Sequence, residues 1–140
     1  MRKKRTILWG GIVLLILIGA GWGWYLYDKP HRSAAGITPD LIITADSLYS
    51  QYQNDERTAD RKFMGKILAV SGKLSEIQHN GNTEIWILSA DPKAAGGINC
   101  QFFAGTKIDQ EPKPGDAVTI KGRCTGFLMD VNLTDCVPDK

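Results

Sequence analysis

The sequence predicts a small, mainly β domain with an N-terminal helix, carried behind a single transmembrane helix. Three observations favour this class. Residues 7–27 contain no charged side chain, residues 44–63 show helical spacing of apolar side chains, and residues 68–137 fall into five short strand-like segments separated by turn signals. Once the apolar segment and a linker are set aside, about 95 residues remain, which is enough for one small domain.

Residues 7–27 have the length and composition of a membrane-spanning helix. As an α-helix they extend for about 31 Å, which matches the hydrocarbon core of a bilayer. The basic run from Arg2 to Arg5 favours a cytoplasmic N-terminus, so the rest of the chain would lie outside the membrane. A cleaved signal peptide ending at Ser33-Ala34-Ala35 is the alternative. The long apolar run and its aromatic end favour an uncleaved anchor.

We therefore expect four parts: a cytoplasmic basic tail over 1–6, an anchor over 7–27, a linker over 28–43 and a folded domain over 44–140. The tail holds four of the 17 basic residues, which leaves 13 against 15 acidic residues and a net charge of −2 beyond it. A net acidic domain lacks the electrostatic footprint of a strong nucleic-acid binder.

A helix is predicted to begin at Thr44, a suitable N-cap with Asp46 in the first turn. Apolar side chains then recur at i, i+3, i+4 and i+7 as far as Tyr52, so one face of this helix packs against the domain. The pattern breaks near Asn54, and a second short helix is expected over 58–63.

Five strands are expected after the helices, at about 68–74, 84–88, 98–103, 117–124 and 129–137. Gly72 in the first strand indicates a bend or a bulge. Leu133 and Cys136 are three residues apart, so a bulge near Asp135 would return Cys136 to the interior. Five strands of which the first is long and kinked predict a closed Greek-key barrel, the OB-fold. Closure also removes exposed strand edges.

Three cysteines, Cys100, Cys124 and Cys136, lie in the part predicted to be outside, where disulfides persist. Their odd number allows at most one intramolecular bond, and their spacing matches no metal site. In an OB barrel the fifth strand lies between the third and the fourth. The third and fifth strands run parallel, which favours a Cys100–Cys136 bond, whereas antiparallel register separates Cys124 from Cys136. A Cys124–Cys136 bond and three reduced thiols remain alternatives.

Several short motifs resemble the tRNA-anti-like family of OB-fold proteins of the bacterial envelope. They are Lys62-Phe63-x-Gly65-Lys66-x-Leu68-x-Val70-x-Gly72, Gly115-Asp116-x-Val118-x-Ile120-Lys121-Gly122-x-Cys124-x-Gly126 and Leu133-x-Asp135-Cys136. The likeness covers roughly residues 45–137 and implies an OB-fold. Members often carry a membrane or lipid anchor, which implies a single-pass protein of the bacterial inner membrane with its C-terminal domain periplasmic or extracellular. The family name rests on likeness to anticodon-binding domains, which is an analogy of fold.

The predicted ligand site lies on the face of the second and third strands, where OB-folds bind. It comprises Glu84, Trp86, Asn99, Gln101 and Phe103, provided that these side chains point outward. Trp86 beside Phe103 would stack a base or a sugar. The family resemblance instead places Trp86 in the core.

Catalysis finds no support in the sequence. Neither His31 nor His79 is arranged with a nucleophile and a carboxylate, and no catalytic or phosphate-binding motif occurs. We therefore predict a binding module without enzymatic activity, cofactor or metal. Its expected partner is an envelope protein or a glycan. The alternative partner is single-stranded nucleic acid, which the acidic charge balance does not favour.

Overall fold

The structure is a computed structural model that describes residues 2–27 and 34–139, with side chains from residue 11 onward except those at 24, 26 and 27. The chain divides into two compact units, residues 1–31 and 32–140. His31, Ser33 and the predicted linker from 28 to 33 lie outside the described residues.

The first unit holds one helix, α1 (Arg2–Tyr27). The seven successive side chains from Ile12 to Ile18 are between 49% and 71% exposed, which covers every side of the helix. A search of the described residues finds no helix with the length and apolar character needed to cross a membrane.

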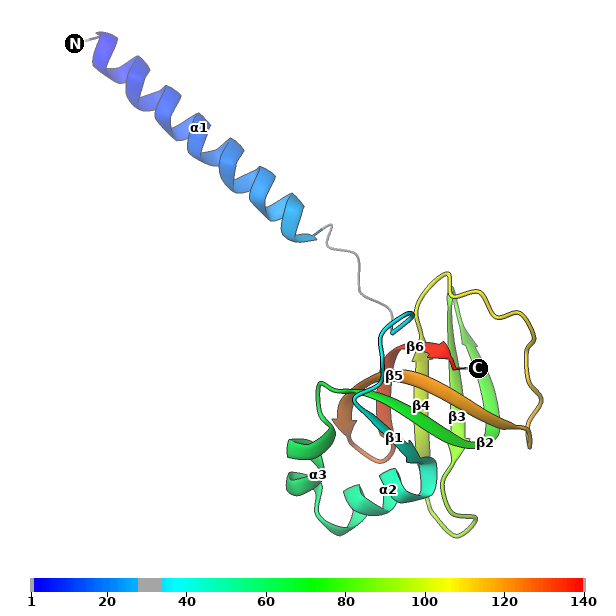
Figure 1. Cartoon of the computed structure of the whole chain (residues 1–140). Helices are drawn as coiled ribbons and strands as arrows, with labels where there is room; N and C mark the ends of the chain where they lie inside the picture. The colour runs from blue at the N-terminus through cyan, green and yellow to red at the C-terminus, as the bar shows by residue number, and fades with distance from the viewer. Residues whose placement is uncertain (1, 28–33, 140) are drawn as a thin grey trace. The chain divides into compact units, whose positions relative to one another are not determined.

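The second unit is a closed barrel of five strands with one further strand on its edge (Figure 1). In chain order its elements are β1 (Leu41–Thr44), α2 (Ala45–Asn54), α3 (Glu56–Phe63), β2 (Ile67–Asn80), β3 (Thr83–Ser89), β4 (Gly97–Phe102), β5 (Ala117–Phe127) and β6 (Val131–Pro138). The sheet order is β1-β2-β3-β4-β6-β5, and pairing of β2 with β5 closes the barrel. All five predicted strands and the OB strand order are therefore confirmed.

Strand β1 corrects the predicted linker, which was expected to run to residue 43. β1 lies parallel to the first half of β2, with Leu41 opposite Leu68 and Thr44 opposite Ser71. β3 pairs with β2 only from Lys73 onward, so the same edge of the first half of β2 would otherwise be open. The strand-forming sequence Leu-Ile-Ile-Thr fills that edge.

The two short helices pack against the barrel as the apolar spacing predicts. The Thr44 side chain caps α2 by accepting a hydrogen bond from the backbone N–H of Ser47 at 3.3 Å. The buried face of α2 ends at Tyr52, whose ring stacks on Phe127 with centroids 5.4 Å apart. α3 ends at Phe63, which is fully buried. The Tyr52–Phe127 contact joins α2 to β5.

One predicted bulge is confirmed and another is moved. The β5–β6 register slips beside Asp135, whose φ is 54°, and Cys136 returns to the core with no exposed surface. In β2 the bulge falls at Ser75 and not at Gly72. Gly72 instead allows close approach of α2, because a Cβ there would lie 2.9 Å from the Cβ of Ala45.

Candidate binding face

Three rows of side chains cross β2, β3 and β4 on the side away from the core. From β2 through β3 to β4 the rows are Gln78–Ile85–Gln101, Glu76–Ile87–Asn99 and Lys73–Ser89–Gly97. We call these nine residues the outer face. Because side chains alternate along a strand, the outer-face residues of β3 point away from the core that holds Trp86 and Leu88.

The outer face has an apolar centre and a polar border. Ile85 and Ile87 lie in the middle strand and are half-buried, whereas Gln78 and Gln101 on the flanking strands are exposed. Its single cation is Lys73, which takes part in none of the ion pairs found among the described residues.

A cavity of about 350 Å³ lies at one end of this face, lined in part by Asn99, Gly96 and Asp130. The Asp130 carboxylate accepts hydrogen bonds from the backbone N–H of Gly97 at 2.7 Å and from the side-chain amide of Asn99 at 3.3 Å. A Cβ on Gly96 would lie 2.6 Å from the carbonyl oxygen of Met129. Asp130 and Gly96 therefore hold the β5–β6 loop against the outer face.

The β5–β6 loop presents two apolar side chains to solvent. Leu128 is 88% exposed and Met129 is 77% exposed. The residue that follows them, Asp130, lines the cavity of about 350 Å³. In OB-folds the loop between the fourth and fifth barrel strands flanks the ligand face. Residues 128 and 129 therefore lie beside the end of the outer face that holds Gly97 and Asn99.

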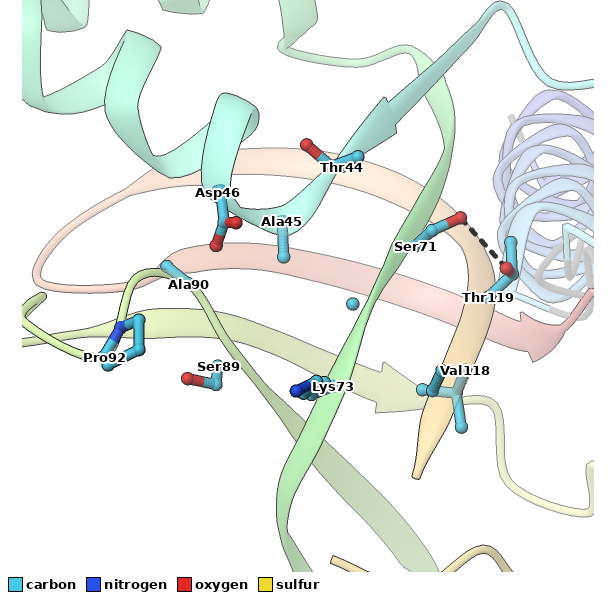
Figure 2. Close-up of a pocket in the computed structure, with 12 residues that line it drawn as sticks. Thr44, Ala45, Asp46, Ser71, Lys73, Ser89, Ala90, Pro92, Val118 and Thr119 are labelled. Carbon is cyan, nitrogen blue, oxygen red and sulfur yellow. Dashed lines mark hydrogen bonds between the residues drawn. The ribbon is translucent and has the colours of Figure 1, made fainter. Parts of the chain in front are cut away.

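A larger cavity, of about 490 Å³, lies over the middle of β2 (Figure 2). Hydroxyl groups from β1, β2, β3 and β5 line it, namely those of Thr44, Ser71, Ser89 and Thr119. The hydroxyls of Ser71 and Thr119 share a hydrogen bond of 3.0 Å across β2 and β5. The hydroxyls and the Lys73 ammonium equip this cavity for hydrogen bonding.

The two cavities are neighbours that share lining residues. Ser89 and Pro92 line both, and the larger cavity adds Lys73 and Asp46 with one charge of each sign. We call the two cavities together the groove; its lining extends from the hydroxyls around the middle of β2 to the amide of Asn99 on β4. It can accept hydrogen-bonding groups along its length and apolar groups at its centre.

A family model described as tRNA_anti-like matches residues 1–137. The chain belongs to the tRNA_anti-like family. This membership confirms the resemblance that the motifs indicated. A search of curated proteins finds none that matches this tRNA_anti-like chain.

Among solved structures, the tRNA_anti-like chain is similar to a lipoprotein of Klebsiella pneumoniae subsp. pneumoniae MGH 78578, described as a candidate nucleic acid-binding protein. The TM-score is 0.59 at 16% identity, over 70% of this chain and 91% of that one. At such identity the likeness shows the fold. The chain is also similar to OBody AM1L10 and OBody AM3L09, each bound to hen egg-white lysozyme. Their TM-scores are 0.42 and 0.41 at 19% and 16% identity, covering 56% and 55% of this chain and 78% and 84% of theirs.

The structure separates the predicted ligand residues of this tRNA_anti-like domain. Asn99 and Gln101 lie on the outer face of β4, as predicted. Trp86 does not, because it is 2% exposed and its ring packs in the core on Phe102 with centroids 4.5 Å apart. Glu84 lies on the Trp86 side of β3, and its carboxylate accepts a hydrogen bond from the indole N–H at 3.2 Å.

Phe103 lies away from the other predicted residues. It is half-buried just after β4 and lines a separate cavity of about 400 Å³ together with Lys121 and Val137. The predicted stacking platform of Trp86 and Phe103 is therefore wrong. Ile85 and Ile87, which were not among the predicted ligand residues, occupy the outer face in place of Trp86. The signal that could have found them is the family resemblance, which places Trp86 in the core, since alternation then turns residues 85 and 87 outward.

The remaining reactive groups lie outside the groove. Cys100, Cys124 and Cys136 are buried free thiols. His79 lies 3.9 Å from the carboxylate of Glu84 and 3.8 Å from that of Glu111. Over residues 2–27 and 34–139, no three His, Cys, Asp or Glu side chains are grouped so as to hold a metal ion.

Proposed function

We propose that this chain is a membrane-anchored module that displays its OB barrel outside the cytoplasm and binds a protein of the bacterial envelope. The observation that carries this proposal is the make-up of the outer face. Ile85 and Ile87 form an apolar centre within a border of amides, and the exposed Leu128 and Met129 flank it. Protein contact surfaces have an apolar centre within a polar rim.

The proposed anchor rests on α1 and on the basic tail before it. Large apolar side chains are exposed on every side of α1 from Ile12 to Ile18. A helix that is apolar all round needs an apolar environment, which a bilayer supplies. The basic residues from Arg2 to Arg5 favour a cytoplasmic N-terminus. Fusion of alkaline phosphatase after Lys140 should then give active enzyme. An inactive phosphatase fusion together with a fluorescent cytoplasmic reporter at the same position would overturn this orientation.

The Klebsiella lipoprotein of the same fold is described as a candidate nucleic acid-binding protein. This observation favours a second candidate function, the binding of single-stranded nucleic acid. Faces that bind single strands combine cations along the backbone with aromatic rings that stack bases. The outer face has one cation, Lys73, and Trp86 lies in the core. A protein partner therefore fits the outer face better than a nucleic acid. A glycan could form hydrogen bonds with the hydroxyls of the groove, but it would not need the exposed apolar side chains of Leu128 and Met129 for binding.

We further propose that the module binds without catalysing a reaction and without a cofactor. The groove gathers hydroxyl and amide groups together with Lys73. Among the described residues the one histidine is His79. It faces the carboxylates of Glu84 and Glu111 outside the groove and is not arranged with a nucleophile.

Site-specific photo-crosslinking in cells tests the proposal. A photo-reactive residue in place of Gln101 or Leu128, both exposed, should yield an adduct with one protein, whereas the same residue in place of Arg57 on α3 should not. Ile87→Asn should weaken binding of that purified protein at least about tenfold, with an unchanged circular dichroism spectrum. Adducts of equal yield at Arg57, or adducts that contain carbohydrate, would contradict a protein-binding outer face.

Titration with labelled single-stranded DNA tests the second candidate. If the outer face binds protein, the full chain in mild detergent should show no specific binding at either 50 or 200 mM salt. Binding that weakens by orders of magnitude over this range would identify a nucleic-acid binder, since phosphate contacts release counterions. Lys73→Gln would then reduce that salt dependence.

A further inference from the structure

We propose that oxidation joins Cys100 and Cys136 in a disulfide between β4 and β6, while Cys124 stays a thiol. The two sulfurs belong to strands that are neighbours in the closed barrel and far apart in the sequence. The inference holds whatever partner the outer face binds, because all three cysteines lie in the core.

The register of β4 and β6 places Cys100 and Cys136 on neighbouring strands, one inward-facing position apart along them. In this parallel pair Cys100 lies opposite Leu133, and Phe102 lies opposite Cys136. The bulge at Asp135 adds a residue to β6 between these two positions and turns Cys136 inward. Burial and a side-chain hydrogen bond with Cys100 raise the pKa of the Cys136 thiol. Both side chains are fully buried, so the two thiols face the barrel core from neighbouring strands before any bond forms.

The same register excludes Cys124 as a partner of Cys100. Leu133 of β6 lies opposite Cys124 on one side and opposite Cys100 on the other. These two cysteines are thus two strand spacings apart, about 9–10 Å, whereas bridged cysteines have Cα atoms closer than about 7 Å. The Sγ of Cys124 also lies 3.4 Å from the Tyr52 hydroxyl. The Cys124 thiol therefore has its hydrogen-bonding partner on α2.

The sulfur of Cys136 is placed at the crossing of β5 and β6. A Cβ on Gly122 would lie 2.5 Å from this Sγ. The absence of a side chain at Gly122 gives Cys136 its space. The strand arrangement therefore favours the pair of Cys100 and Cys136.

The oxidant is a disulfide-bearing compound or protein, and the reaction is thiol–disulfide exchange. The thiolate of one cysteine attacks a sulfur of the oxidant's disulfide, so a mixed disulfide forms and one thiol of the oxidant leaves. The second thiolate then attacks the mixed disulfide and releases the other thiol. The chain loses two protons and two electrons, and the oxidant becomes a dithiol. Because Cys100 and Cys136 have no exposed surface, this step must precede the docking of β6.

Peptide mapping after oxidative refolding tests the pairing. The full chain in mild detergent is unfolded and reduced, refolded with oxidised and reduced glutathione, and then treated with a thiol-blocking reagent. A peptide that joins Cys100 to Cys136 is expected, with Cys124 modified only after renewed unfolding. A crosslink that contains Cys124, or three unlinked thiols after refolding, would overturn the pairing.

Two controls keep the outcome interpretable. Cys124→Ala should retain the crosslink and Cys136→Ala should lose it; mapping of the unaltered chain decides the matter if a variant does not fold. Folded, reduced chain exposed to the same glutathione should oxidise at least about tenfold more slowly than the refolding chain, because its thiols are buried. Equal rates would show that β6 docking does not shield the pair.

Discussion

The substitution Gly122→Ala, which adds one methyl group, tests how closely β5 and β6 pack where they cross. A Cβ there would lie 2.5 Å from the Sγ of Cys136, and 3.3 Å from both the Cβ of Leu133 and the carbonyl oxygen of Thr134. Cys136 is fully buried and Leu133 is 1% exposed, so neither can move into solvent. Overpacking of this kind costs about 1–3 kcal/mol. For a domain of this size, about 2 kcal/mol lowers the melting temperature by about 8–16 °C.

A double-mutant cycle shows whether the sulfur is the obstacle. Cys136→Ala removes the Sγ, so Gly122→Ala should cost at least about 1 kcal/mol less in that background than in the parent. Thermal melting followed by circular dichroism, with all four proteins kept in reductant, gives the coupling energy without a contribution from any disulfide. Gly122→Ala that melts like the parent, or that costs the same in both backgrounds, would refute the proposed crossing.

Three further predictions concern the core, the groove and alkaline pH. Val70 is fully buried, so Val70→Asp should cost several kcal/mol and abolish the β-sheet signal at 25 °C; unchanged melting would show that Val70 is not in the core. Asp130→Ala leaves the Gly97 N–H without its acceptor and should destabilise the domain by about 1–3 kcal/mol, with faster amide exchange at Gly97 than in the parent; unaltered exchange would argue against that bond. Burial and the hydrogen bond with Cys124 raise the pKa of Tyr52 above its usual range. Tyrosine in the unfolded chain ionises near pH 10 while the buried ring stays neutral, so stability should fall as pH rises above about 10, and Tyr52→Phe should flatten that fall. Equal falls in denaturant melts of both proteins would exclude Tyr52.

Features were predicted correctly from the sequence where a local pattern is compatible with a single structure. Leu133 and Cys136 are both apolar and three residues apart, and a bulge is the way for one strand to bury both, as Asp135 confirms. Thr44 is a strong N-cap before an amphipathic segment, and α2 begins there. Such features need no knowledge of distant residues.

Two features depended on tertiary contacts that no local pattern contains. Leu41–Thr44 is too short for a periodic signal, and it becomes β1 because β3 leaves half of one edge of β2 open. In β3 four successive residues from Ile85 to Leu88 are apolar. Alternation therefore allows either Ile85 and Ile87 or Trp86 and Leu88 to be the set that faces the core. Packing of the Trp86 ring on Phe102 decides which set is buried. That choice determined which predicted ligand residues lay on the outer face.

The position of β6 has a consequence for how the chain matures. β6 is the last strand of the barrel in chain order, yet it lies between β4 and β5, and each of these pairs with it along most of its length. Until residues 131–138 have emerged, β4 and β5 each present a long unpaired edge, and the barrel has no closed state to reach. Its long-range pairings also make folding slow relative to helical domains. The species most exposed to aggregation or proteolysis is therefore a nascent chain from which residues 131–138 have not yet emerged, and a holding chaperone would protect this domain most in that interval.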